Sequence, residues 1–154
     1  MKNHIVIIIF IAFLQTAFGQ ISPGANQLEE YLPQLQRKSV GIVANQSSLI
    51  ANTHLVDSLL SRGVHINKVY APEHGFRGKA EAGAHVKNGK DPITGLSVLS
   101  LYGTNKKPNA EQLAGIDVMI FDLQGVGARF YTYISTLKYI MEACAENNIP
   151  LIIL

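Results

Sequence analysis

The stretch DVMIFDLQGVGARFYTYISTLKYIMEACAENNIPLIIL, residues 117–154, decides the fold. It begins with a short apolar run at residues 117–121 and ends with a second at residues 150–154. Between the two runs, residues 135–146 carry apolar side chains at helical spacing, at Leu137, Ile140, Met141 and Cys144. Two strands joined through a helix lie parallel in one sheet, because the helix brings the chain back to the starting edge. The stretch therefore predicts an α/β fold.

The preceding residues continue this alternation. Apolar runs predict strands at residues 40–44, 66–70 and 97–101, and helical periodicity predicts helices at residues 28–35, 53–60 and 110–113. Residues 72–95 are Gly-rich and have no clear period. We expect an open, Rossmann-like parallel sheet of about five strands, with helices on both faces. The fifth strand stops at the end of the sequence, so we expect residues 20–154 to be the N-terminal domain of a longer protein.

The composition narrows the class of protein. Of the 154 residues, 47% are hydrophobic and 16% are charged, which is enough apolar surface for one folded domain. The 13 Lys+Arg against 11 Asp+Glu give a net charge of +2, too small for a dedicated nucleic-acid binder. The single cysteine, Cys144, excludes an internal disulfide framework and a multi-cysteine zinc site. We expect Cys144 to be a small core residue.

The first twenty residues, MKNHIVIIIFIAFLQTAFGQ, have the pattern of a secretory signal peptide. Lys2 precedes an apolar run at residues 5–14, and the small residues Ala17 and Gly19 follow at the spacing of a cleavage site after Gly19. The run is shorter than the roughly 20 residues that span a bilayer, so an uncleaved membrane anchor is the weaker alternative. We expect a signal peptide at residues 1–19 and export to the periplasm or the extracellular space.

Polar residues follow four of the predicted strands, where open α/β sheets bind their ligands. These segments are NQSS (45–48), PEHGFRG (72–78), YG (102–103) and DLQGVGARFYTY (122–133). Glu73 is a candidate general acid, because a desolvated carboxyl group keeps its proton to higher pH. The alternative is that Glu73 caps a turn or pairs with Arg77. His74 is a candidate to orient Glu73, to move a proton or to bind a metal, and otherwise a hydrogen-bonded structural residue.

A second group of candidates surrounds Arg129. Its guanidinium matches a carboxylate bidentately, and Tyr131 and Tyr133 suit a sugar ring with one apolar face and polar edges. The alternative is an aromatic helix start packed into the core beside a surface arginine. Asp122 is a candidate second carboxylate, or a loop cap.

The sequence favours neither a metal nor a dinucleotide cofactor. Glu73, His74 and His85 match no standard zinc spacing, and the glycines at 125 and 127 lack the third glycine of the dinucleotide fingerprint.

Five stretches occur in an order that resembles the NamZ-type exo-β-N-acetylmuramidases, a glycoside hydrolase family. They are GIVANQSSLI, YAPEHGFRGKAEAG, DPITGLSVLSLYG, LAGIDVMIFDLQGVGARFYTYISTL and IPLIIL, within residues 40–154. The resemblance implies removal of terminal N-acetylmuramic acid from the non-reducing end of peptidoglycan fragments, in a cleft shared with a C-terminal part. We expect no cofactor. Taking the residues and the resemblance together, we predict as catalytic residues Glu73, His74 and Asp122, and as substrate-binding residues Asn45, Arg77, Gln124, Arg129, Tyr131 and Tyr133.

The resemblance also implies that a cation binds the substrate, and it shows one position at which this chain differs from the family. Muramic acid carries a lactyl carboxylate that N-acetylglucosamine lacks, so selectivity calls for Arg77 or Arg129 in the cleft. The family usually has Asp where this chain has Gly125. Two alternatives follow, a peptidoglycan-sugar binding module that has lost catalysis and another exported hydrolase on the same scaffold. The second carboxylate and the substrate's own acetamido group both stay open as the partner of the acid.

Overall fold

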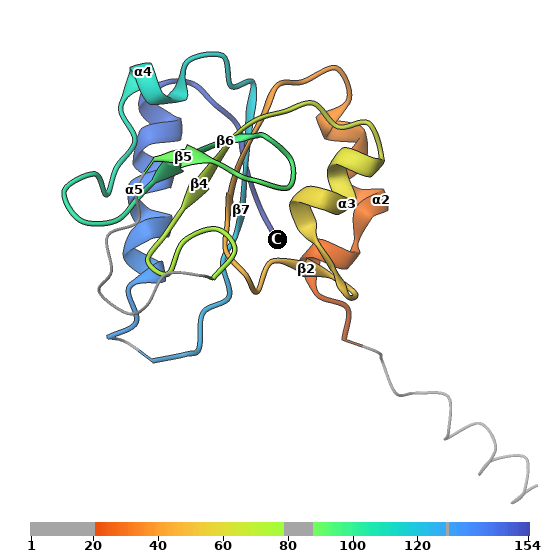
Figure 1. The fold of residues 1–154 in the computed structure, drawn as a ribbon, viewed down its shortest axis with the longest axis horizontal. Helices are drawn as coiled ribbons and strands as arrows, with labels where there is room; N and C mark the ends of the chain where they lie inside the picture. Colours follow the sequence, from red (N-terminus) through yellow and green to blue (C-terminus); the bar gives the residue numbers. More distant parts are fainter. Residues whose placement is uncertain (1–20, 79–87, 129) are drawn as a thin grey trace, which may run out of the picture.

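The computed structural model describes residues 21–78, 88–128 and 130–154. Its centre is a six-stranded sheet in the order β5-β6-β4-β1-β7-β8 (Figure 1). The strands are β1 (Val40–Ala44), β4 (Ile66–Ala71), β5 (Gly89–Lys90), β6 (Ser97–Ser100), β7 (Val118–Asp122) and β8 (Leu151–Ile153). Within this sheet only β5 pairs antiparallel, with β6. The predicted α/β class with a mainly parallel sheet is confirmed.

The strand count exceeds the predicted five. The additions are β5 and a separate two-stranded ribbon made of β2 (Leu49–Ile50) and β3 (Thr53–His54). Each of these strands has two residues, which is too short for a hydrophobic period to be visible in the sequence.

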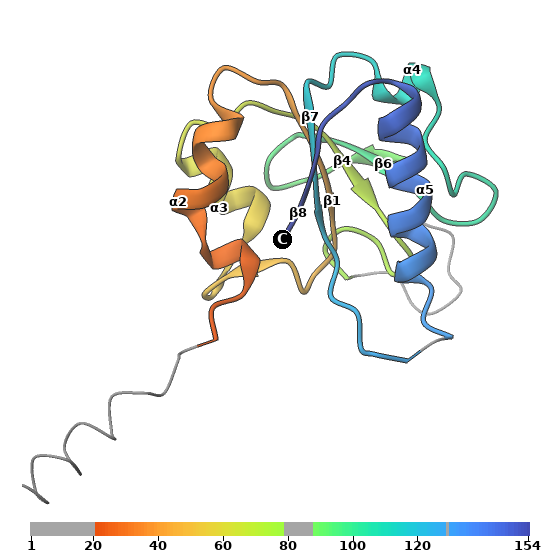
Figure 2. The same cartoon turned by 180° about the vertical axis from the view of Figure 1, so that it is seen from behind.

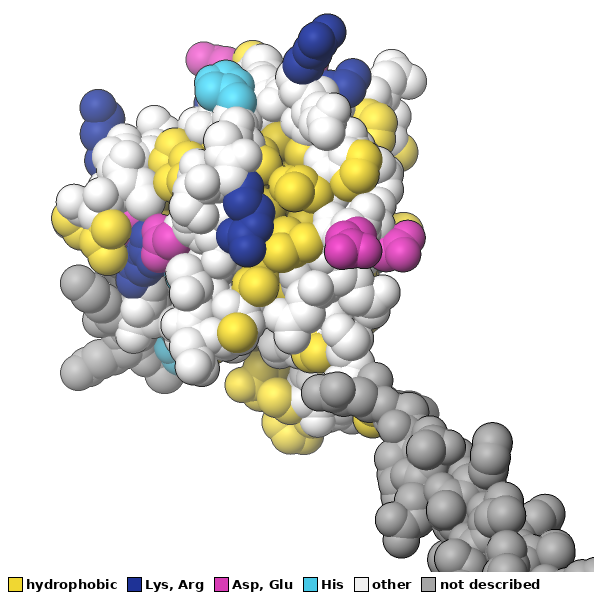
Figure 3. Space-filling model, turned by 90° about the vertical axis from the view of Figure 1, so that its right-hand side faces the viewer, with side chains coloured by type: hydrophobic (Ala, Val, Ile, Leu, Met, Phe, Trp, Pro, Cys, Tyr) yellow, Lys and Arg dark blue, Asp and Glu magenta, His cyan; other side chains and the backbone are white. Residues whose placement is uncertain are grey.

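Helices cover both faces of the sheet, as predicted (Figure 2). On one side lie α2 (Leu28–Tyr31), the 3₁₀ helix η2 (Leu32–Leu35) and α3 (Leu55–Ser61); on the other lie α4 (Ala110–Leu113) and α5 (Tyr133–Glu146). The sheet separates two hydrophobic cores, one packed against α3 and the other packed against α5. Successive side chains of β1 point to opposite faces, so Ile42 lies in the α3 core and Val43 lies in the α5 core. Figure 3 views the side on which α2 and α3 lie, where hydrophobic side chains are visible between polar ones.

Two helix boundaries differ from the prediction for local reasons. The helix expected at residues 28–35 tightens to 3₁₀ geometry after Tyr31, where Pro33 lacks an N–H and disfavours an α conformation before it. The helix expected at residues 53–60 begins at Leu55. Its N-cap is His54, whose Nδ1 accepts a hydrogen bond from the Val56 N–H at 3.2 Å.

Cys144 is buried in the core between the sheet and α5, as predicted, and burial raises the pKa of its thiol to about 11.

The strand order places a switch point between β1 and β7. β4 and β6 lie on one side of β1, and β7 and β8 lie on the other. Register pairs Ala44, the last residue of β1, with Asp122, the last residue of β7. In open α/β sheets, ligands bind outside the carboxyl ends of the strands at such a point, because the two exiting loops separate there.

The first and last described segments touch. Gly24 begins the 3₁₀ turn η1 (Gly24–Asn26), and a Cβ at this position would lie 2.7 Å from the backbone carbonyl carbon of Leu154. Only glycine fits so close an approach. The Leu154 N–H donates to the Phe121 carbonyl at 3.1 Å, which ties this contact to β7.

The predicted signal peptide at residues 1–19 lies outside the described residues. Within the described ranges the longest helix, α5, has 14 residues, and no helix there combines the length and apolar character needed to cross a bilayer.

Candidate functional site

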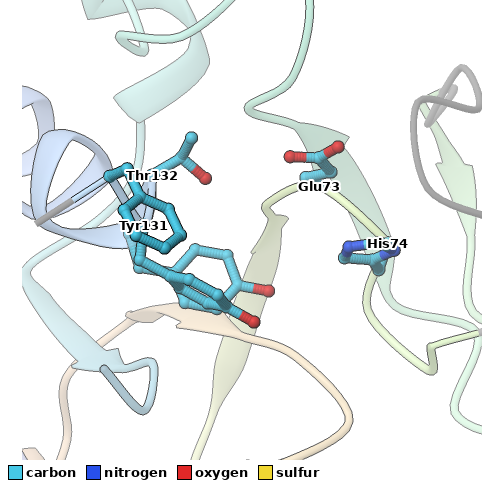
Figure 4. A pocket seen from close by; sticks show the side chains of 6 residues that line it. Glu73, His74, Tyr131 and Thr132 are labelled. Carbon is cyan, nitrogen blue, oxygen red and sulfur yellow. The ribbon is translucent and has the colours of Figure 1, made fainter. Parts of the chain in front are cut away.

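A hollow of about 250 Å³ opens at the carboxyl edge of the sheet. One wall is the loop after β4 and the other is the segment leading into α5; the lining residues are Glu73, His74, Phe130, Tyr131, Thr132 and Tyr133. Figure 4 shows Glu73 and His74 across the hollow from Tyr131 and Thr132. The structure therefore brings together four of the predicted site residues, which are Glu73, His74, Tyr131 and Tyr133.

The loop after β4 holds Glu73 and His74 in a tight turn. The Gly75 N–H donates to the Pro72 carbonyl at 3.0 Å. His74 has φ 69°, in the left-handed region that few residues other than glycine adopt. Such a conformation costs on the order of 1 kcal/mol and persists only where the surrounding structure enforces it. Beneath the turn, Phe76 is buried and meets the His54 ring edge to face, with centroids 4.7 Å apart.

Glu73 lies among phenol groups. Its negative charge raises the pKa of Tyr102, together with desolvation and a side-chain hydrogen bond between the two residues. Burial raises the pKa of Tyr133, and the charge of Glu73 is a further contribution. The Tyr131 and Tyr133 rings meet edge to face, with centroids 5.6 Å apart. The carboxyl group therefore has a hydroxyl donor on one side and an aromatic wall on the other.

A second hollow of about 200 Å³ adjoins the first. The two share Glu73 and Thr132, and the remaining lining residues of the second are Leu101, Tyr102, Lys106, Ser135, Thr136 and Tyr139. Glu73 therefore lies at the junction of the two hollows. Among the described residues that line them, it is the only carboxylate. A carboxyl group between two binding hollows is suited to give a proton to a bond that links two parts of a ligand.

Asn45 lies beneath the first hollow rather than in its lining. Its side chain is buried, and its Nδ2 donates to the Tyr133 hydroxyl at 3.1 Å. Its Oδ1 accepts from the Ser47 N–H at 2.9 Å and from the Ser47 hydroxyl at 2.7 Å. Asn45 thus fixes both the loop after β1 and the aromatic wall.

Asp122 and Gln124 line neither hollow. Asp122 is 0% exposed, and no described residue forms a hydrogen bond with its Oδ2. The Gln124 Nε2 donates to the Asp122 Oδ1 at 3.5 Å, a long contact. Burial raises the pKa of Asp122 to about 6.

Arg77 also lies away from both hollows. Its guanidinium donates to both carboxylate oxygens of Asp57 at 2.8 Å and to both of Asp91 at 3.2 and 2.8 Å. Burial alone would raise the pKa of Asp91, but hydrogen bonds from Arg77 and Thr94 outweigh this effect and lower the pKa to about 2. The structure therefore uses Arg77 to join α3 to the loop before β6. These contacts do not include Glu73, the partner that the alternative interpretation of Glu73 gave to Arg77.

Arg129 and His85 lie outside the described residues. Within the described part of the chain, no three His, Cys, Asp or Glu side chains cluster as metal ligands would.

Sequence reasoning missed most of the second hollow. Thr132, Ser135, Thr136 and Tyr139 follow the spacing i, i+3, i+4, i+7, which puts them on one face at the start of α5. This polar stripe was available as a signal. Lys106, in contrast, stands in a loop with no periodicity to mark it.

Comparison with known proteins gives a consistent result. A family model described as "Exo-beta-N-acetylmuramidase NamZ, N-terminal" matches residues 40–154. A Bacillus subtilis (strain 168) protein named peptidoglycan beta-N-acetylmuramidase NamZ is 44% identical over 131 residues, which cover 82% of this chain and 31% of that protein.

Two solved structures of DUF1343 family proteins from Bacteroides fragilis NCTC 9343 are similar to the chain. The first is 39% identical with a TM-score of 0.73, over 82% of this chain and 32% of the other. The second is 37% identical with a TM-score of 0.72, over 85% and 33%. The chain spans about a third of the length of these relatives.

Proposed function

This chain belongs to the exo-β-N-acetylmuramidase NamZ family, and on that premise we propose that the protein carrying it hydrolyses terminal, non-reducing N-acetylmuramic acid from peptidoglycan fragments. The observation that carries the proposal is the position of Glu73 at the junction of two hollows, with aromatic side chains on one side. A disaccharide unit has this form, two rings joined through one glycosidic oxygen.

Glu73 is the proposed general acid. Hydrolysis breaks the bond between the anomeric carbon and the leaving oxygen, and that oxygen must receive a proton as the bond breaks. Glu73 gives this proton, and water supplies the hydroxyl group of the released sugar. Tyr102, whose hydroxyl is hydrogen-bonded to Glu73, positions the carboxyl group.

The aromatic wall is the proposed platform for one sugar ring. Phe130 is 89% exposed and Tyr131 is 42% exposed, and both line the first hollow together with the largely buried Tyr133. Sugars bind such surfaces through their apolar face, while their hydroxyls bond at the edges. Asn45 acts through Tyr133 as a positioning residue.

Asp122 is proposed to hold the exit of β7 and not to touch substrate, since it is buried and lines neither hollow. The partner of Glu73 in the reaction then comes from the substrate's acetamido group or from parts of the protein outside this chain.

We also propose that the protein is exported. The pattern of residues 1–19 supports this, and peptidoglycan substrates lie outside the cytoplasmic membrane.

The test uses the intact protein that carries this chain and the disaccharide in which N-acetylmuramic acid is β-linked to N-acetylglucosamine, because a sugar leaving group needs a proton from the acid whereas 4-nitrophenolate leaves without one. Glu73→Gln should lower kcat by about 100-fold or more, because general acid catalysis contributes about 10² to 10⁴. Glu111→Gln, on the exposed side of α4, is the matched control and should keep the wild-type rate. Equal rates for wild type and Glu73→Gln would remove Glu73 as the acid. Binding of a muropeptide without turnover would replace the proposed enzyme by a binding module.

A further inference from the structure

We infer that the second hollow is the subsite for the muramoyl ring, and that the ammonium group of Lys106 binds the lactyl carboxylate there. The inference rests on the proposed function, because it names the group by which the site selects its sugar. It also replaces Arg77 in that role, since the Arg77 guanidinium is held by Asp57 and Asp91.

Lys106 is the only Lys or Arg among the described residues that line the two hollows. Its side chain is exposed, and it forms no hydrogen bond or ion pair with the described residues. The next residue, Lys107, differs in this respect, with its Nζ 2.7 Å from Glu146 and 3.5 Å from Glu142. The positive charge of Lys106 is therefore available to a ligand.

The loop that carries Lys106 is anchored on both sides of it. Before it, the Asn105 Nδ2 donates at 2.7 Å to the carbonyl of Ser100, the last residue of β6. After it, Lys107 is bound to the carboxylates of α5. A fixed backbone reduces the conformational entropy lost on binding, so a single lysine at this place gains affinity.

The other lining groups suit a sugar. Thr132, Ser135 and Thr136 offer hydroxyls along one face at the start of α5, and Tyr102 and Tyr139 add aromatic surface. The second hollow is also the more enclosed of the two, as expected for the subsite that holds a chain end.

The charges in the hollow explain why a cation is needed. A substrate carboxylate that enters the hollow gives up part of its hydration, which is unfavourable unless a positive charge replaces the lost water. Lys106 is the only lysine or arginine in the described lining that can supply this charge. A ring bound with its carboxylate at Lys106 brings its glycosidic oxygen to Glu73 and leaves the aromatic hollow for the departing sugar.

The experiment compares three 4-nitrophenyl glycosides with the intact protein: the β-N-acetylmuramide, its lactyl methyl ester and the β-N-acetylglucosaminide. Lys106→Met should raise KM for the muramide about tenfold, as expected for the loss of a hydrogen bond to a charged group. It should leave kcat and the kinetics of the two uncharged substrates close to wild type. Lys106→Arg should restore most of the affinity.

Lys138→Met is the matched control, an exposed lysine on α5 that lines neither hollow, and it should behave as wild type. A Lys106→Met protein that keeps the wild-type preference for the acid over its ester overturns the inference and leaves the proposed function standing. Equal losses on acid and ester also overturn it, because they indicate a structural role. A wild-type protein that cleaves none of the three substrates overturns the proposed function and the inference with it.

Discussion

The Asn45 Nδ2 donates a hydrogen bond to the Tyr133 hydroxyl over 3.1 Å, joining the exit of β1 to the first residue of α5. Asn45 is 2% exposed and Tyr133 is 9% exposed. The bond therefore lies in the protein interior, where an unpaired polar group is unfavourable. It links the central strand of the sheet directly to the wall of the candidate site.

Tyr133→Phe should destabilise the protein by about 1–2 kcal/mol, because it leaves the buried Asn45 amide without its acceptor. Denaturation by urea measures the change in the free energy of unfolding. Tyr131→Phe is the control, because Tyr131 is 42% exposed and its hydroxyl forms no hydrogen bond with another described residue. Equal effects of the two substitutions would show that the Asn45–Tyr133 bond contributes nothing.

Asp122 should make stability fall as pH rises. Burial raises its pKa from 3.8 to about 6, so the folded state keeps a proton that the unfolded chain releases near pH 4. The favourable contribution is complete below about pH 4 and is lost by about pH 6. At 1.36 kcal/mol per pKa unit, the loss is roughly 3 kcal/mol.

Asp122→Asn should remove this dependence, since an amide does not titrate. Unfolding measured from pH 4 to pH 7 should give similar stability for the two proteins at the acid end and a more stable variant at pH 7. If the free energies of unfolding of wild type and Asp122→Asn change with pH in parallel, Asp122 does not titrate in this range.

Arg77→Met should lower the free energy of unfolding at pH 7 by about 3 kcal/mol or more, because it leaves the buried Asp91 carboxylate without its cation. The pKa of Asp91 is lowered to about 2, so the pair stabilises the fold above about pH 4 and loses this effect as pH falls through 2. The difference in free energy of unfolding between Arg77→Met and wild type should therefore become smaller below pH 4. A raised KM for the muramide in the folded variant would instead return Arg77 to the substrate site.

Gly125→Asp should be tolerated. A Cβ at Gly125 meets no atom within 4 Å, and its φ lies outside the left-handed region. The free energy of unfolding should change by less than about 0.5 kcal/mol, as for most surface substitutions. If the Asp usual in the family contributes to the reaction, kcat/KM should rise; an unchanged value removes that role.

Gly127→Asp is the matched control for stability. Gly127 also has open space around it, but its φ is +75°. A side chain there is strained, so this variant should lose about 1 kcal/mol while Gly125→Asp does not. Similar losses for both would contradict the assignment of the strain to φ.

Local patterns predicted the buried elements well. The apolar run at residues 40–44 coincides with β1 and the helix at residues 110–113 with α4, because complete burial of a strand and one turn of amphipathic helix both leave a visible pattern. The two-residue strands β2, β3 and β5 left none. Strand order also could not be predicted, since it depends on pairings between distant segments.

The candidate site was predictable to the extent that it follows from the sheet. Ligands of open α/β sheets bind at the carboxyl edge, and this rule predicts that Glu73 and Tyr131 lie close together. In the structure both residues line one hollow. The partners of Arg77 were not predictable, because Asp57 lies on α3 and Asp91 in a loop, with no local spacing that links them to it. The polar face at the start of α5 has a helical spacing that is visible in the sequence, but its residues were not among those predicted for the site.

The contact between Gly24 and the backbone of Leu154 sets an order of events during synthesis. A ribosome releases η1 early and Leu154 only after every other described segment. The contact of Gly24 with Leu154 therefore forms only after β8 has left the exit tunnel, whereas Asn26 of the same turn can accept its hydrogen bond from the Ala51 N–H, at 3.2 Å, much earlier.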